Sequence, residues 1–155
     1  MEVILQRLSF IAVSLLICAD PSSAKDALLN GLWMETANYP ASSVLRFEKS
    51  GKALVGKYRQ VSVPQKHWGF SIGETVIRGE MQGNKFVGQV LLKLSKDFLA
   101  ECPNLDAGWA PIELTLIEPG KFYGRWRQTY FSEENPCQAV GHTWQLYGLE
   151  QLKLN

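Results

Sequence analysis

The chain has little histidine, little cysteine and almost no net charge. Its 155 residues include two histidines and three cysteines, with no Cys-x-x-Cys pair and no His-Glu-x-x-His sequence. These spacings build the common zinc sites, so we expect no metal. The net charge of +1 lacks the basic excess that a nucleic-acid-binding face requires. We therefore predict no nucleic-acid partner, no cofactor and no catalytic residues, and we expect that the chain is not an enzyme.

Long hydrophobic runs are also scarce. The longest, from Leu8 to Cys18, is too short to span a bilayer but has the length of a signal-peptide core. The segment 22–24, Ser-Ser-Ala, then offers small residues at the cleavage subsites. We predict a signal peptide over residues 1–24 and a periplasmic or secreted mature chain that does not span the membrane. An uncleaved anchor is the alternative, because Glu2 opposes Arg7 in the short segment before the apolar run.

Composition and length exclude a disordered chain and a two-domain chain. Hydrophobic residues make up 46% and charged residues 20% of the sequence, far from the composition of disordered segments. Without the signal peptide, residues 25–155 have room for a single domain. They retain two cysteines, Cys102 and Cys137. In an exported protein such a pair is expected to form a disulfide. The alternative, a metal ligand or reactive thiol, has no neighbouring motif to support it.

The sequence has no long run with the apolar spacing of a helix. It has instead short runs in which apolar and polar residues alternate. Three runs carry a glycine in the middle of the apolar row: LVGKYRQ at 54–60, FVGQV at 86–90 and FYGRWRQ at 122–128. Each follows a turn that contains a glycine, and another alternating run precedes each turn, which is the pattern of a β-hairpin. A glycine in mid-strand also favours strong coiling of the strand.

The alternating runs predict eight strands, at about 31–37, 43–48, 53–61, 74–81, 85–94, 110–118, 121–131 and 142–152, with a helical turn at 96–101. Parallel pairing would need a crossover of a dozen or more residues at every step, and the sequence has none. We therefore predict an all-β fold, an eight-stranded antiparallel up-and-down β-barrel, because closure leaves no exposed sheet edge. A two-sheet sandwich whose glycines mark bulges is the alternative.

The lengths of the connections add a geometric prediction. In an up-and-down barrel, alternate connections lie at the same end. The long connections at 62–73, 95–109 and 132–141 therefore gather at one end, and Cys102 and Cys137 lie in two of them. This agrees with a disulfide, whose Cα atoms must lie within about 7 Å of each other.

Two motifs resemble a known superfamily. Gly31-Leu32-Trp33 opens the first predicted strand, and GKALVGKY occupies 51–58. With the up-and-down order, they resemble the calycins, the superfamily of lipocalins, fatty-acid-binding proteins and avidins, and the second motif is similar to avidin-type barrels. The Thr-Asp-Tyr type of second lipocalin motif is missing, and Glu35 stands where avidin-like proteins place a polar biotin ligand. The resemblance implies a barrel with a wide looped end, and it does not imply biotin binding.

The residues predicted to face inward suggest an apolar cup. Small barrels either fill their interior with side chains or hold one small ligand. In an open interior, aromatic residues form apolar walls and glutamines near the looped end orient the ligand. In a filled interior, the same aromatics pack the core and the glutamines bond to loop backbone. The candidate ligand-binding residues are Trp33, Tyr58, Gln60, Phe86, Trp126, Gln128 and Tyr130.

The looped end is a second candidate site, since loops on a rigid scaffold commonly carry binding. Its aromatic and histidine side chains either engage a protein partner or fold back over the mouth. The candidates are Tyr39, His67, Trp68, Phe70 and Trp109. We expect an exported binding protein that holds a small apolar or amphipathic ligand. The alternative is a protein-interaction module, such as a secreted inhibitor or envelope component, that acts through the looped end.

Overall fold

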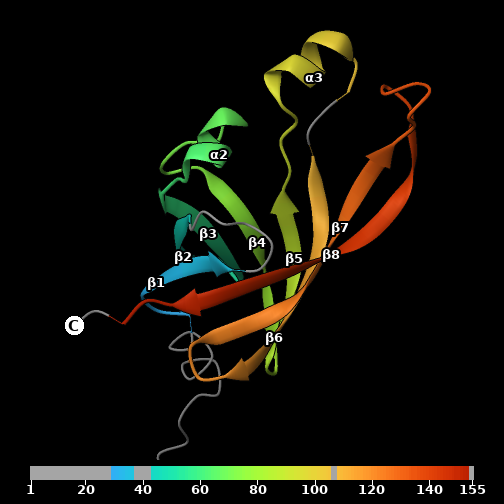
Figure 1. Ribbon diagram of the computed structural model, residues 1–155. Coiled ribbons are helices and arrows are strands. Elements are labelled where there is room, and N and C mark those ends of the chain that lie inside the picture. The colour runs from blue at the N-terminus through green and yellow to red at the C-terminus, as the bar shows by residue number, and fades with distance from the viewer. Residues whose placement is uncertain (1–28, 37–42, 106–107, 154–155) are drawn as a thin grey trace, which may run out of the picture.

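Each strand of the barrel pairs with the next strand in the sequence, and β8 returns to β1 and closes the sheet (Figure 1). The computed structural model describes residues 29–36, 43–105 and 108–153. The strands are β1 (Leu32–Thr36), β2 (Val44–Ser50), β3 (Ala53–Gln60), β4 (Thr75–Gln82), β5 (Lys85–Leu91), β6 (Trp109–Glu118), β7 (Lys121–Phe131) and β8 (Ala139–Gln151). Neighbouring strands run antiparallel throughout. The predicted all-β, eight-stranded antiparallel barrel is confirmed.

Two short helices interrupt the connections. The helical turn expected at 96–101 is α3 (Lys96–Glu101). The sequence predicts an irregular connection at 62–73, but α2 (Val63–His67) forms there, with Ser62 as its N-cap. Pro64 lies in the first turn of α2, where a missing backbone N–H costs nothing because that N–H has no partner within the helix.

The mid-strand glycines allow neighbouring strands to approach closely. A β-carbon on Gly88 would meet the backbone of Arg78 and Gly79 on β4, and one on Gly124 would meet the carbonyl oxygen of Glu113 on β6. These backbone atoms cannot move aside without disturbing the strand pairing, so neither position has room for a side chain. The adjacent strand therefore fills the space that these glycines leave, and this space adds nothing to a ligand cavity.

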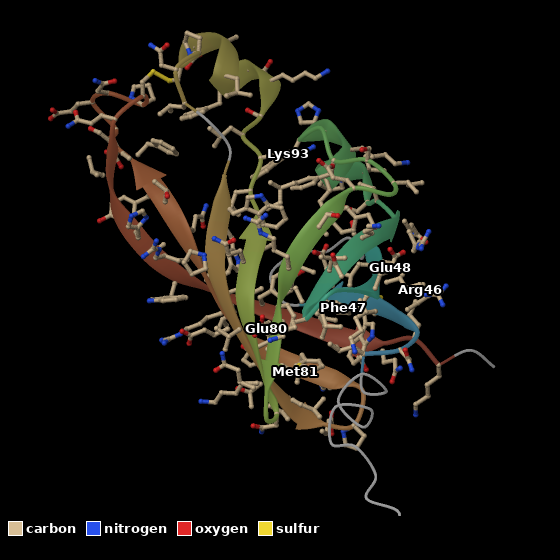
Figure 2. The ribbon with its side chains drawn as sticks, turned by 180° about the vertical axis from the view of Figure 1, so that it is seen from behind. Arg46, Phe47, Glu48, Glu80, Met81 and Lys93 are labelled. Atoms are coloured by element: carbon tan, nitrogen blue, oxygen red, sulfur yellow. A yellow bond between two sulfur atoms is a disulfide. The ribbon has the colours of Figure 1, made fainter. Side chains whose placement is uncertain are left out.

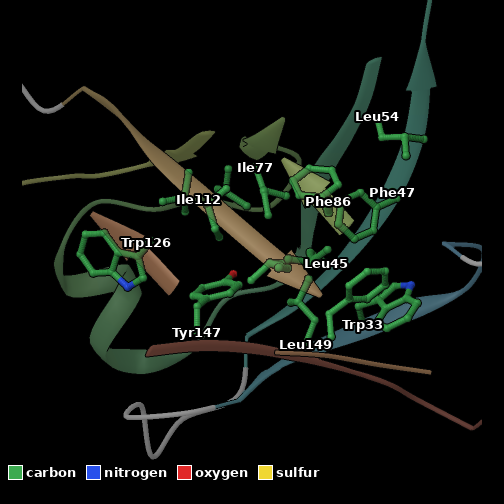
Figure 3. Packing of buried hydrophobic residues seen from close by; sticks show 14 of the residues in the cluster. Trp33, Leu45, Phe47, Leu54, Ile77, Phe86, Ile112, Trp126, Tyr147 and Leu149 are labelled. Atoms are coloured by element: carbon green, nitrogen blue, oxygen red, sulfur yellow. The ribbon is translucent and has the colours of Figure 1, made fainter. Parts of the chain in front are cut away.

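Large apolar side chains fill one part of the barrel interior (Figure 3). The ring of Trp33 packs edge-on against Phe47, with centroids 6.4 Å apart, and lies 5.4 Å from the ring of Phe122. Phe47 in turn lies 5.7 Å from Phe86. In Figure 3, Trp33 and Phe47 lie at the opposite end of the cluster from Trp126. The interior around Trp33 is therefore solid.

The long connections lie together at one end of the barrel, where Figure 1 shows α2, α3 and the β7–β8 connection. Cys102, at the C-terminal end of α3, forms a disulfide with Cys137 of the β7–β8 connection, with Cα atoms 5.2 Å apart. Figure 2 shows this sulfur–sulfur bond beside α3. The predicted gathering of these connections and the predicted disulfide are confirmed. The predicted signal peptide at 1–24 lies outside the described residues.

Candidate functional site

A cavity of about 740 Å³ opens at the looped end of the barrel. Residues of β1, of β3, of β5 to β8 and of the loops that carry α2 and α3 form its wall. Many of them are aromatic, and these include Tyr58, Trp68, Phe70, Phe98, Trp109 and Trp126. The barrel is therefore packed at one end and hollow at the other.

Glu35 of β1 is a buried carboxyl group on the cavity wall, with 7% of its surface exposed. The hydroxyl of Tyr58 lies 3.0 Å from its Oε1 and 3.1 Å from its Oε2. Tyr147 Oη donates to Oε1 at 2.5 Å, and Gln65 Nε2 donates to Oε2 at 2.7 Å. We call Glu35, Tyr58, Gln65 and Tyr147 the Glu35 cluster.

The strand register explains how β1 and β8 contribute to this cluster. Glu35 points inward because it follows Trp33 by two residues, and both are buried on β1. Glu35 pairs with Leu149 across the β1–β8 ladder. Tyr147 lies two residues from Leu149 on the same buried face of β8, and a side chain as long as tyrosine reaches such a diagonal neighbour. Closure of the barrel therefore brings the Tyr147 hydroxyl to Glu35.

The cap of α2 brings Gln65 to the cluster. Ser62 Oγ accepts a hydrogen bond from the backbone N–H of Gln65 at 3.4 Å, as an N-cap does. In a capping box the glutamine side chain would return to the N–H of the cap residue, but here the N–H of Ser62 donates to Ser43 Oγ at 2.9 Å. The side-chain amide of Gln65 instead donates to Glu35 and, at 2.8 Å, to the hydroxyl of Tyr58.

The electrostatics of the cluster centre on Glu35. Burial raises the pKa of the Glu35 carboxyl group above its ordinary value of 4.5, and hydrogen bonds from Tyr147, Gln65 and Tyr58 partly oppose this shift. These three neighbours are uncharged. Within the described ranges, no lysine, arginine or histidine forms an ion pair with Glu35. The protonation state of this carboxyl group is therefore sensitive to any charge that enters the cavity.

Cross-links hold the loops at the cavity mouth. The Cys102–Cys137 disulfide joins α3 to the β7–β8 connection. The rings of Phe98 on α3 and Phe131 on β7, which line the cavity, lie 5.1 Å apart. These contacts hold one wall of the mouth together.

Lys93 connects the segments on the other side of the mouth. Its ammonium group forms an ion pair with Glu74 at 2.5 Å and donates to the carbonyl oxygen of Gly69 at 2.8 Å. It also lies 5.0 Å from the ring centroid of Phe70. Lys93 therefore ties the end of β5 to the loop that follows α2.

The predicted ligand-binding residues fall into three groups. Tyr58, Trp126, Gln128 and Tyr130 line the cavity. Trp33 and Phe86 belong to the packed core and are not part of the cavity wall. Gln60 is exposed at the end of β3.

A β-bulge accounts for the position of Gln60. Leu45 pairs with Tyr58, whereas the preceding residue Val44 pairs with Gln60, so Arg59 is an extra residue on β3. An extra residue breaks the in-and-out alternation of a strand. Tyr58 is buried, and both residues that follow it are exposed.

The predicted loop-end residues are also divided. Trp68, Phe70 and Trp109 line the cavity. The guanidinium group of Arg78 lies 4.1 Å above the ring of Trp109, which is half-buried. His67 is exposed on α2 and is not part of the cavity wall. Tyr39 lies outside the described residues.

Three residues of the Glu35 cluster were not among the predicted ligand-binding residues, although each has a sequence signal. Glu35 is a charged residue at an inward position, two residues after Trp33. Gln65 ends the pattern Ser-x-x-Gln at 62–65, a helix-start signature. Tyr147 lies on the same alternating row as Leu149. Without the strand register, these signals do not predict that the three side chains meet.

The pattern Gly-x-Ser-x-Gly occurs at 69–73. In a nucleophile elbow this pattern lies on a turn from a strand into a helix, but here it lies between α2 and β4. Ser71 is exposed, and its backbone N–H donates to Glu74 Oε2 at 3.1 Å. Neither described histidine forms a hydrogen bond with Ser71. The surroundings of Ser71 therefore do not match those of a catalytic serine.

In the ranges that the structure describes, no three histidine, cysteine or acidic side chains come together as a metal site. In the same ranges, no helix has the length and apolar character needed to cross a membrane.

Comparisons with known proteins concern the architecture. No protein-family model and no curated protein matches the chain. Among solved structures, the chain is similar to a redesigned β-barrel, with a TM-score of 0.43 and 17% sequence identity, covering 83% of this chain and 94% of that chain.

Proposed function

We propose that this protein binds one small apolar or amphipathic molecule in the cavity at the looped end of its barrel. The observation that carries the proposal is the cavity of about 740 Å³ beside the Glu35 cluster. Small-molecule sites commonly have volumes of roughly 300–1,000 Å³, apolar walls and a few polar groups that orient the ligand. The aromatic wall and the buried carboxyl group of Glu35 fit this description.

The packing of the rest of the interior supports the same proposal. Protein interiors are close-packed, and unfilled apolar space loses contacts that a packed core would make. Around Trp33 the barrel is filled, whereas the space beside Trp126 and Tyr58 is open. Moving an apolar ligand from water to such a wall is favourable by roughly 25 cal/mol for each Å² of apolar surface buried. A bound molecule would therefore recover the contacts that the open half lacks.

We further propose that the chain is exported and that its barrel is related to those of calycins. The Cys102–Cys137 disulfide supports export, since structural disulfides persist in oxidising compartments. The apolar run from Leu8 to Cys18 supplies the signal. The Gly-x-Trp motif at the start of β1 and the up-and-down strand order support the second part. N-terminal sequencing of the exported protein should give Lys25 as its first residue, and an intact Met1 would contradict export by cleavage.

Binding can be tested with Nile red, a neutral dye whose fluorescence rises in apolar surroundings. We expect saturable binding of one dye molecule per chain. Ala110→Phe should weaken this binding by about tenfold or more, because Ala110 is buried on the cavity wall and a ring there would occupy ligand space. Ala100→Phe is the matched control, since Ala100 is exposed on α3. Absence of saturable binding, or equal binding by both variants, would contradict the proposal.

Exposed apolar side chains around α2 favour a second candidate function, a protein-interaction surface at the looped end. Val63 is 79% exposed, Trp68 43% and Ile72 65%. Exposed aromatic side chains are frequent anchors of protein interfaces. Capture of one protein from an envelope extract by the wild type but not by Trp68→Ala would support this function. Tyr123→Ala is the control, because Tyr123 is similarly exposed but lies on the outer face of β7.

A further inference from the structure

We propose that the ligand of this cavity carries a protonated amine, which forms an ion pair with the carboxylate of Glu35. This inference rests on the proposed binding function and names the chemical class of the ligand. Among the described residues that line the cavity, Glu35 is the one that bears a carboxyl group. A ligand that enters the cavity therefore meets one acidic group, at a fixed position.

Two other glutamates of this protein form ion pairs with basic side chains, which Glu35 does not do among the described residues. Glu48 forms ion pairs with Lys57 and Arg59, each at 2.8 Å, and Glu74 forms one with Lys93 at 2.5 Å. Glu35 is far more buried than these groups, yet within the described ranges no cation pairs with it. A charge is costly to bury without a partner. A cation brought by the ligand would supply that partner.

The hydrogen bonds of the cluster prepare the carboxyl group for such a contact. The hydroxyls of Tyr58 and Tyr147 and the amide of Gln65 act as donors to its two oxygens. An ionised carboxylate offers about four acceptor positions. Three donors therefore fix its orientation, provide no positive charge and leave one position for a ligand N–H. Because these three neighbours are hydrogen-bond donors and not cations, a ligand ammonium group would be the charged partner of the carboxylate.

The surrounding wall suits an organic ammonium ion. The aromatic residues Tyr58, Trp126 and Tyr147 line the cavity together with Glu35. Aromatic faces attract ammonium groups, and the attraction is stronger where water is excluded. Leu92, Phe98 and the other apolar side chains of the wall would contact the hydrocarbon part of the ligand. The cavity thus combines one acidic position with apolar surroundings, as an amphipathic amine requires.

The basic groups of the cavity wall form no ion pair with Glu35 within the described ranges. Lys93, Arg127 and His142 also line the cavity. Lys93 is engaged by Glu74, and Arg127 and His142 are exposed. Oxygen–nitrogen contacts between these groups and Glu35 are not among the ion pairs of the described residues. None of them therefore takes the place proposed for the ligand amine.

Two other roles of Glu35 give different binding patterns. A protonated Glu35 would donate a hydrogen bond to an uncharged ligand. It would then bind a ligand with an ammonium group no more tightly than the same ligand with a hydroxyl group. A purely structural Glu35, which only joins β1, β3, β8 and α2, would show no preference for ligand charge. The charge preference of binding therefore separates the proposal from both.

The test is displacement of Nile red from the mature protein by three ligands with the same chain, octylammonium, 1-octanol and octanoate, at neutral pH. We expect octylammonium to bind about tenfold more tightly than 1-octanol, and octanoate to bind more weakly than both, since one charge-assisted contact is worth about 1.4 kcal/mol or more. Glu35→Gln should remove the advantage of octylammonium and leave the affinity for 1-octanol within about twofold. Glu48→Gln, a surface change, should alter none of the three.

Equal affinities for octylammonium and 1-octanol would overturn the proposal, as would an amine preference that survives Glu35→Gln. If Nile red binds but shows no preference among its competitors, the amine inference fails and the proposed binding function stands. If Nile red and all three ligands fail to bind, both fail. Near-ultraviolet circular dichroism checks that the variants retain the native packing.

A measurement on the wild type makes the test independent of folding of the variant. Octylammonium affinity should fall as pH decreases through the raised pKa of Glu35, because protonation removes the negative charge. The affinity for 1-octanol should stay constant. His142→Gln, which removes an imidazole that also lines the cavity, should show the same pH dependence as the wild type. An octylammonium affinity that does not change with pH would overturn the proposal.

Discussion

The hydroxyl oxygen of Tyr147 lies 2.5 Å from Oε1 of Glu35, although 112 residues separate the two positions. They meet because β8 pairs with β1, and this pairing is the one that closes the barrel. The same closure creates the interior in which Glu35 is buried. The Glu35 cluster is thus a consequence of barrel closure, and its properties can be changed through either residue.

The pH dependence of stability should report the burial of Glu35. Its pKa is raised above 4.5 in the folded chain and returns to the ordinary value on unfolding. Such a group adds stability that is complete below the ordinary pKa and is lost as pH rises through the folded-state pKa. We expect the free energy of unfolding of the wild type to fall over this interval, and that of Glu35→Gln to fall less. Urea denaturation between about pH 4 and pH 8 measures both.

Glu48 is the control for this prediction, because its pKa is shifted in the opposite direction. A hydrogen bond from Lys57 lowers the pKa of Glu48. Its contribution is present above the ordinary pKa and is lost as pH falls through the lowered value. Glu48→Gln should therefore flatten the acidic side of the profile and leave the interval above 4.5 unchanged. Identical profiles for wild type and Glu35→Gln would contradict a raised pKa at Glu35.

Tyr147→Phe should raise the pKa of Glu35 further. The Tyr147 hydroxyl is the hydrogen-bond donor that lowers this pKa most, so its removal leaves burial less opposed. Loss of the buried hydrogen bond should also destabilise the protein by about 1–2 kcal/mol. The midpoint is measured by NMR titration of the Glu35 side-chain carboxyl carbon. Tyr123→Phe, on the outer face of β7, is the control and should not change the titration midpoint of Glu35. A lower midpoint in Tyr147→Phe would contradict the hydrogen bond between Tyr147 and Glu35.

Reduction of the disulfide should lower the stability and weaken ligand binding together. The Cys102–Cys137 bond closes a loop with a sequence separation of 35, for which the chain-entropy model gives about 3–4 kcal/mol. It also holds α3 against the β7–β8 connection at the cavity mouth. Urea denaturation and Nile red titration of oxidised and reduced protein test both effects. Unchanged dye affinity after reduction would show that the bond does not maintain the mouth.

Gly124→Ala should destabilise the barrel by about 1–3 kcal/mol, the usual effect of overpacking. Its β-carbon would meet the backbone of Glu113 and Leu114, which belongs to a paired strand and cannot retreat. Gly108→Ala is the matched control, since a β-carbon there has no atom within 4 Å. Thermal denaturation compares the two, and equal stability would contradict the close approach of β6 and β7 at Gly124.

Local patterns in the sequence were sufficient to predict the strands and their order. In-and-out alternation is a property of each extended segment, and the turns at Gly51, Gly83 and Gly120 have positive φ angles, which glycine adopts without strain. The short connections then required antiparallel neighbours. Sequence order also placed Cys102 and Cys137 at the same end, because alternate connections of a meander share an end.

Tertiary structure alone decided where the interior is filled and where it is hollow. Trp33 and Trp126 both occur on alternating rows and both belong to the buried cluster, but Trp126 also lines the cavity and Trp33 does not. A bulge turned Gln60 outward, which alternation cannot predict. Glu35 gained its partners from three separate elements through barrel closure and the cap of α2. Its raised pKa depends on that burial, since an isolated strand would leave the carboxyl group in water.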